Sequence, residues 1–210
     1  MAKSNELTAP LTAGISYEQL TQHWPVFETQ ILALLDTLDL ADKALFCDHV
    51  ALRVNSISSA DALREAFSRV GNIISDNIIN GRTILIIELD TPLTLGQFRI
   101  DCVELPYPSD KVYPQEGWEH IELVIKSTAE DCQTLSQDLL TLCPTLKPLL
   151  QPTPSTPEVS PYQGIKVKMS SPKGDKERLA NPTIAFKHDN VCIKVHSHCI
   201  KAVIASEQHT

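Results

Sequence analysis

The chain contains Phe46-Cys-Asp-His-Val-Ala-Leu-Arg-Val54 in its first half and Glu119-His-Ile-Glu-Leu-Val-Ile125 in its second. Both stretches are rich in β-branched and aliphatic residues, which predicts a strand in each place. In both of them a histidine follows an acidic residue and precedes aliphatic residues. The two histidines, His49 and His120, are therefore expected at equivalent positions of two related strands.

The first of these strands is followed by a predicted helix and then by three further strands. Ser58 or Ser59 is expected as the N-cap of the helix, and Gly71 is expected to end it. The apolar face of this helix is formed by Leu63, Ala66, Phe67 and Val70. The three strands are expected around residues 73–74, over residues 82–89 after the Asn80-Gly81 turn, and over residues 97–105.

The second strand is followed by the same order of elements. Thr128 and Asp131 resemble a capping box, and the helix that they open is expected to stop before Pro144. Its apolar face is formed by Leu135, Leu139 and Leu142. Residues 144–161 hold six of the fourteen prolines, which is typical of an exposed connection. Strands are then expected over residues 164–169, 183–187 and 191–195.

The order strand, helix and three strands thus occurs twice, and this repetition predicts the fold class. We predict an α+β fold in which two βαβββ modules form a curled mixed sheet around a central cavity, with an added N-terminal helical segment. Residues 1–44 form the N-terminal arm and helix, residues 45–110 the first module and residues 111–210 the second, within one compact domain. The helix is expected from Pro25, in its first turn, to about Leu40, and residues 1–15 are expected to be a loose arm.

Composition and charge exclude several classes of protein. The net charge is −8, which is the wrong sign for binding nucleic acid through its phosphates. No apolar run reaches the ~18 residues that a membrane span needs, and the N-terminus lacks the apolar stretch of a signal peptide. We therefore expect a cytoplasmic protein without a membrane partner. The six cysteines include no Cys-x-x-Cys pair, so they are interpreted as mostly buried and reduced rather than as zinc ligands or disulfides.

Polar residues on the expected strands point to a metal site in the cavity. His49 and His120 come from the opening strands of the two modules, and Glu104 lies among apolar residues in the closing strand of the first. The remaining ligand is either His196, in the closing strand of the second module, or Glu122. Imidazole nitrogen and carboxylate oxygen suit Zn²⁺, Fe²⁺, Mn²⁺ or Ni²⁺ better than Ca²⁺. The alternative is that the histidines are hydrogen-bonded core residues.

Three further residues are candidates for catalysis. Glu122, if it is not a ligand, is placed to act as a general base beside the metal. Arg53 follows His49 on the same strand, and Arg82 follows the Asn-Gly turn, so both are candidates for holding a carboxylate or phosphate of the substrate. For each arginine a surface ion pair is an equal alternative. A hydrolase with Cys102 or Cys192 as nucleophile has no local sequence signature.

Several motifs spread over most of the chain resemble the YecM proteins of bacteria. The matching runs are Asp48-His49, Ile79-Asn80-Gly81-Arg82, Val103-Glu104-Leu105-Pro106, Tyr113-Pro114, residues 116–122, residues 170–174, Glu177-Arg178-Leu179, Asn181-Pro182-Thr183 and residues 205–208. That family is similar in fold to the vicinal oxygen chelate superfamily, which includes glyoxalase I, extradiol dioxygenases and bleomycin-resistance proteins. The N-terminal arm and the proline-rich connection lie outside these motifs.

The resemblance implies which strands supply the ligands. In that superfamily the metal ligands typically come from the first and last strands of each module, which correspond here to His49, Glu104, His120 and the strand from Lys194 to His196. This sequence departs from the superfamily pattern at the last of these strands, where His196 stands in place of the carboxylate that glyoxalase-like members usually supply.

The expected function is that of a metal-dependent enzyme acting on a small oxygen-rich substrate, with isomerase, lyase or dioxygenase chemistry. The alternative is a protein of the same fold that binds or sequesters a small molecule without converting it. Because one chain contains both modules, a monomer is expected, and a dimer is possible.

Overall fold

The structure, a computed structural model, describes residues 14–152, 161–171 and 178–207. After the helix α1 (Tyr17–Thr37), the first half of the chain contains β1 (Phe46–Arg53), α2 (Ile57–Phe67), β2 (Gly71–Ile79), β3 (Arg82–Leu95) and β4 (Phe98–Pro106). The second half contains β5 (Gly117–Val124), α3 (Cys132–Leu142), a 3-10 turn (Pro144–Leu146), α4 (Lys147–Leu150), β6 (Lys166–Ser170), β7 (Thr183–His188), β8 (Val191–His196) and α5 (Ile200–Glu207). The fold is therefore of the α+β class.

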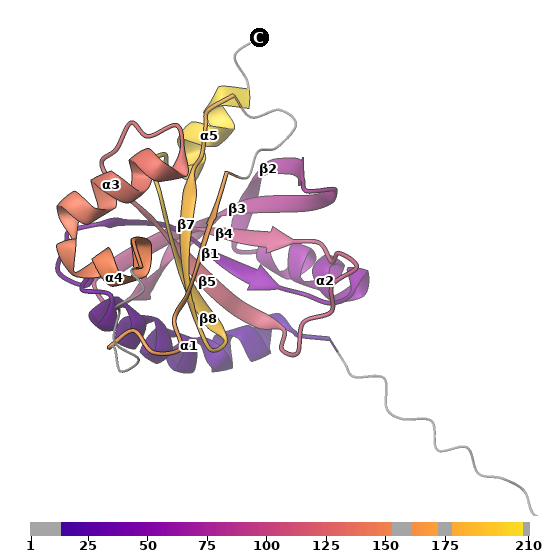
Figure 1. The fold of residues 1–210 in the computed structure, drawn as a ribbon. Coiled ribbons are helices and arrows are strands. Elements are labelled where there is room, and N and C mark those ends of the chain that lie inside the picture. Colours follow the sequence, from indigo (N-terminus) through magenta and orange to yellow (C-terminus); the bar gives the residue numbers. More distant parts are fainter. Residues whose placement is uncertain (1–13, 153–160, 172–177, 208–210) are drawn as a thin grey trace, which may run out of the picture.

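The eight described strands form one open, curled sheet in the order β2-β3-β4-β1-β5-β8-β7-β6 (Figure 1). Each half of the chain contributes four neighbouring strands, and the halves meet where β1 pairs with β5 in antiparallel direction. In each half the first strand is parallel to the last, because β1 pairs with β4 and β5 pairs with β8. The opening and closing strands of both halves thus lie together in the middle of the sheet.

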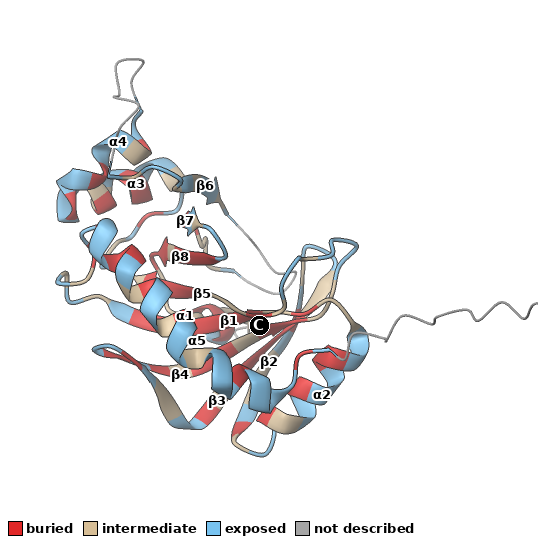
Figure 2. Cartoon of the chain, turned by 90° about the horizontal axis from the view of Figure 1, so that it is seen from below, coloured by how far each residue is buried: buried red, intermediate tan, exposed pale blue. Residues whose placement is uncertain are grey.

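The two faces of the sheet are covered differently. One face packs against α1, α2 and α3 and forms the main core, to which the central strands contribute Val50, Leu52, Ile121, Leu123, Ile193 and Val195. The opposite face has a small apolar cluster in which Ile84, Ile86 and Cys102 pack against Ile200 and Ile204 of α5. Figure 2 shows that the central strands are largely buried. Polar side chains on the second face therefore lie inside the protein.

Helix α1 begins earlier than the sequence pattern predicts. Ser16 is its N-cap and forms a capping box with Gln19, so the helix starts at Tyr17 and Pro25 lies inside it rather than in its first turn. The capping box satisfies the first backbone N–H groups, and the burial of Leu20 and Phe27 holds the helix together on both sides of the proline.

Other element boundaries also differ from the expected ones. The N-cap of α2 is Ser56, whose hydroxyl accepts from the backbone N–H of Ser59, and neither Ser58 nor Ser59 caps the helix. Asp131 alone caps α3, so Thr128 does not open a capping box there. The connection after α3 contains a 3-10 turn and α4, and α5 was not expected at all. Of the predicted N-terminal arm, residues 1–13 lie outside the described residues, as do residues 153–160 of the connection.

The Asn-Gly turn between β2 and β3 is confirmed. Asn80 and Gly81 have φ values of 52° and 78°, which is the left-handed geometry that a tight hairpin requires at both central positions. The turn places Arg82 at the first position of β3. Within the described residues, no helix combines the length and the apolar character needed to cross a bilayer.

The main core predicts a large difference between two substitutions on α1. Ile31 is fully buried, whereas Val26 on the same helix is 62% exposed. We expect Ile31→Ala to lower the free energy of unfolding by about 2–5 kcal/mol, because it removes apolar contacts and leaves a cavity. Val26→Ala should change it by less than about 0.5 kcal/mol. Urea denaturation of the two variants measures both effects, and equal losses would contradict the packing of α1.

Candidate metal centre

The register of the central strands brings four polar side chains onto one face of the sheet. Ala51 of β1 pairs with Glu104 of the parallel strand β4 and with His120 of the antiparallel strand β5. His49 lies two residues before Ala51 and pairs with Glu122, which lies two residues after His120. Residues two apart in a strand share a face, and so do residues paired across strands. The histidines and glutamates therefore point to the same side.

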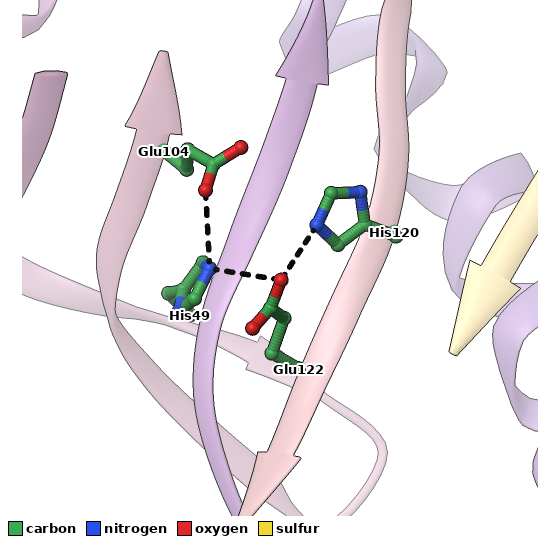
Figure 3. Close-up of side chains that lie close together, drawn as sticks. All are labelled: His49, Glu104, His120 and Glu122. Atoms are coloured by element: carbon green, nitrogen blue, oxygen red, sulfur yellow. Dashed lines mark hydrogen bonds and ion pairs between the residues drawn. The ribbon is translucent and has the colours of Figure 1, made fainter. Parts of the chain in front are cut away.

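These four residues form a compact cluster (Figure 3). The Nε2 atom of His49 lies 3.7 Å from Glu104 Oε2 and 3.6 Å from Glu122 Oε1, and His120 Nε2 lies 3.1 Å from Glu122 Oε1. One ligand atom from each residue can be chosen so that all lie within 4.8 Å of one another. Atoms bound to one ion at about 2.0–2.2 Å lie roughly 3–4 Å apart, so the cluster has nearly the size of a coordination sphere.

In each histidine of the cluster, the Nδ1 atom contacts a carboxylate. Asp48 Oδ2 lies 3.1 Å from His49 Nδ1, and Glu119 Oε2 lies 2.5 Å from His120 Nδ1. Each acid is the residue immediately before its histidine, so the Asp-His and Glu-His pairs of the sequence are small structural units. A carboxylate on Nδ1 fixes the ring orientation and leaves Nε2 free to face a metal, as metal-binding histidines generally require.

The two supporting carboxylates are themselves held by other parts of the protein. Asp48 accepts a hydrogen bond of 2.7 Å from the backbone N–H of Ile200, at the start of α5. Glu119 accepts from the guanidinium of Arg53, which also lies 4.6 Å above the ring of Tyr113. Arg53 is thus engaged in an ion pair that supports His120, and it does not line the cavity beside the cluster.

The cluster is buried in the protein. His49, His120 and Glu122 are 1%, 3% and 6% exposed. Within the described part of the chain, the buried Nε2 atom of His49 has no hydrogen-bond partner. A buried polar atom without a partner costs about 1–3 kcal/mol, so such an atom calls for a ligand. Its position between two carboxylates fits a cation.

In the cluster, burial and the interactions between charged groups shift the pKa values in opposite directions. Burial disfavours the protonated ring of His49, but the charge of Glu122 and the hydrogen bond with Asp48 raise the pKa of His49 well above its ordinary value. Burial also disfavours ionised Glu122, but Lys194 and His49 hold its pKa well below the ordinary value. Burial also disfavours ionised Glu104, but the contact with His49 and the charges of Lys194 and His120 together lower its pKa. Both glutamates are therefore charged and able to act as ligands.

The sequence of this protein matches one family along almost its whole length. The sequence model described as YecM protein matches residues 16–207. Protein YecM of Escherichia coli strain K12 is 36% identical over 191 residues, which is 91% of this chain and 94% of that protein. The chain belongs to the YecM family.

Two further matches agree with this assignment. A Haemophilus influenzae protein described as uncharacterized is 38% identical over 183 residues, covering 84% of this chain and 87% of that protein. A solved structure described as the structural-genomics protein EC4020 is 32% identical and has a TM-score of 0.74, covering 98% of this chain and 100% of that one. Membership of the YecM family, predicted from the sequence motifs, is confirmed.

In this YecM-family structure, the predicted site residues other than Arg53 fall into three groups. His49, Glu104, His120 and Glu122 form the cluster. His196 lies beside it rather than in it, with its Nε2 atom 3.6 Å from Asp48 Oδ2 and its Nδ1 atom 3.6 Å from Glu122 Oε2. Burial lowers the pKa of His196. Arg82 lines a cavity of about 130 Å³ next to the cluster, whose wall also includes Asn80, Asn181 and Lys194.

Three residues of the site have roles that sequence reasoning missed. The ammonium of Lys194 donates to Glu122 Oε1 at 2.7 Å, and this contact raises the pKa of Lys194 although burial opposes it. Strand alternation places Lys194 on the face of His196, so the signal was present. Asp48 and Glu119 were noted only as part of a repeated pattern. Their position before each histidine could have identified them as supporting carboxylates.

The Lys194–Glu122 pair predicts a measurable coupling. In protein treated with a chelator, Lys194→Met and Glu122→Gln should show an interaction of about 1–3 kcal/mol in a double-mutant cycle of unfolding, because the pair is largely removed from water. The exposed pair of Lys201 and Glu88 is the matched control. Lys201→Met and Glu88→Gln should show a coupling of less than about 1 kcal/mol. Equal coupling in the two cycles would contradict the burial of Lys194.

Proposed function

We propose that this protein is a metal-dependent enzyme whose divalent cation is held by His49, Glu104, His120 and Glu122. The observation that carries the proposal is the buried Nε2 atom of His49, which has no hydrogen-bond partner among the described residues and lies 3.7 and 3.6 Å from two ionised carboxylates. His120, on the neighbouring strand β5, also directs its Nε2 atom at the carboxylate of Glu122. Supporting carboxylates on both Nδ1 atoms fit a metal site better than a structural pair of histidines.

The donor set limits the identity of the metal. Two imidazole nitrogens and two carboxylate oxygens suit Zn²⁺, Fe²⁺, Mn²⁺ or Ni²⁺. Ca²⁺ and Mg²⁺ prefer sites made of oxygen alone. Two cysteines pair with the histidines in the register, Cys102 with His49 and Cys192 with His120. Burial raises the pKa of each to about 12, so both are poor thiolate ligands.

We further propose that the two halves of the chain are βαβββ modules of the vicinal oxygen chelate type. The strand order supports this, because each half supplies four neighbouring strands with its first and last strands in parallel contact at the centre of the sheet. The second half departs from the simple order through the 3-10 turn and α4. Since one chain supplies all four ligands, a monomer has a complete site.

The chemistry follows from what the side chains around the cavity can do. A bound divalent cation supplies Lewis-acid polarisation of substrate oxygens. Glu122 is held ionised by Lys194 and His49, so it is available as an anionic ligand, and its lowered pKa makes it a weak proton acceptor. Arg82, on the cavity wall, is placed to orient the substrate. Isomerisation, elimination and dioxygenation are compatible with these roles.

A protein that binds a small molecule without converting it is the second candidate. The small cavity, about 130 Å³, favours it because only part of a substrate can enter beside the cluster. The two candidates share the metal site and differ in turnover. Consumption of a bound ligand by the metal-loaded protein distinguishes them.

Metal content tests the proposed site directly. Protein purified without chelator should contain close to one equivalent of transition metal, and His49→Ala/His120→Ala should lose it, because two of four ligands are removed. Elemental analysis by mass spectrometry measures both. The double variant His23→Ala/His188→Ala, which removes two histidines outside the cluster, is the control and should retain its metal. Equal metal content in both double variants would exclude the site.

The supporting carboxylate predicts a smaller effect. Glu119→Gln should weaken metal affinity by about 10–100-fold, because the amide no longer fixes the ring of His120 or strengthens its Nε2 as a donor. Competition with a chromophoric chelator measures the dissociation constant. Glu130→Gln, on an exposed glutamate, should leave it unchanged. An unaltered affinity in Glu119→Gln would mean that Glu119 serves only its ion pair with Arg53.

A further inference from the structure

The two halves of the sheet differ at one equivalent position of the cluster. In the first half, the residue two places after His49 is Ala51, and its partner on the parallel closing strand β4 is Glu104. Glu104 thereby reaches the cluster from the strand next to β1.

In the second half, the residue two places after His120 is Glu122, and its partner on the parallel closing strand β8 is Lys194. Lys194 therefore occupies the position that corresponds to Glu104. Where the first half presents a carboxylate, the second presents an ammonium, and the carboxylate comes instead from the opening strand. The β8 side of the cluster is cationic.

A second cation faces the same cavity from the other half of the chain. Arg82 lines the cavity together with Lys194. Among the described residues, none forms a hydrogen bond or an ion pair with the guanidinium of Arg82. The cavity wall also includes Asn181, whose buried Oδ1 atom lacks a partner among the described residues. Asn80 and Arg82 are shared with an adjoining, more open cavity of about 610 Å³, so the site is open to larger molecules at this end.

The balance of charge indicates what would bind there. A divalent cation carries as much charge as Glu104 and Glu122 together, so a filled metal site neutralises both carboxylates. Lys194 then keeps only the charge of Glu119, which also pairs with Arg53, and Arg82 has no partner among the described residues. Two cations on the wall of one cavity beside a neutralised cluster attract an anion, and a planar guanidinium matches the two oxygens of a carboxylate.

We propose that Lys194 and Arg82 form a carboxylate subsite, and that the substrate is a carboxylic acid with a hydroxyl or carbonyl oxygen on the adjacent carbon. The carboxylate lies between the two cations, and the adjacent oxygen lies toward the metal cluster. This inference rests on the proposed metal site and adds the substrate class to it. The 130 Å³ cavity admits this head group, and the adjoining cavity admits the remainder of the molecule.

Calorimetric titration of the metal-loaded protein tests the subsite. The probes are lactate, its neutral counterpart lactamide, and inorganic phosphate. Lactate should bind at least about tenfold more tightly than lactamide, because a hydrogen bond between charged groups is worth about 1.5–3 kcal/mol. Arg82→Gln should remove this preference while the metal content stays unchanged. Arg82→Lys should retain part of it, and Arg99→Gln, on an exposed arginine of β4, should retain all of it.

The outcomes separate this inference from the proposed metal site. Equal binding of lactate and lactamide, no binding of lactate, or an unaltered preference in Arg82→Gln would overturn the subsite while the metal content still supports the cluster. Tighter binding of phosphate than of lactate would overturn the assignment to carboxylic acids. Absence of metal from wild-type protein would overturn the metal site, and the subsite with it.

Discussion

The antiparallel pairing of β1 with β5 is the contact on which the rest of the structure depends. It joins the two halves of the sheet and places His49 opposite Glu122. A shift of this pairing by one residue would turn every side chain of one strand to the other face, which would disperse the cluster and expose the core. The site and the fold therefore depend on the same register.

The apolar face of these strands fixes that register. Val50 and Leu52 of β1, together with Ile121 and Leu123 of β5, are at most 1% exposed and pack beneath α1. Burying each such side chain contributes about 1.5–3 kcal/mol. The opposite face buries charged groups, which is unfavourable unless they are paired. The main core thus offsets the cost of holding a cluster of ionised residues inside the sheet.

The sequence predicts what depends on local patterns and misses what depends on pairing between distant strands. Alternation within one strand predicts that His120 and Glu122 share a face. The repeated acid-histidine pattern predicts that His49 lies at the equivalent position of the other opening strand. Strand alternation indicates the face on which Lys194 lies, but its contact with Glu122 depends on the parallel register of β8 with β5, which no local pattern contains. The interior position of Pro25 depends on packing across the whole of α1, and propensity alone favours a helix start there.

Lys194 also connects the metal and the anion energetically. In the structure its ammonium and both histidine rings compete for the same oxygen of Glu122. Glu122 is also a proposed ligand, so a cation held by Glu122 would share this carboxylate with the ammonium of Lys194, which lines the cavity. Each ligand would then bind more tightly in the presence of the other, because linkage requires the coupling to be reciprocal. A carboxylate at the position of Lys194 would remove this coupling, so under the proposed function the departure from the symmetric arrangement would link the binding of the metal to that of the anion.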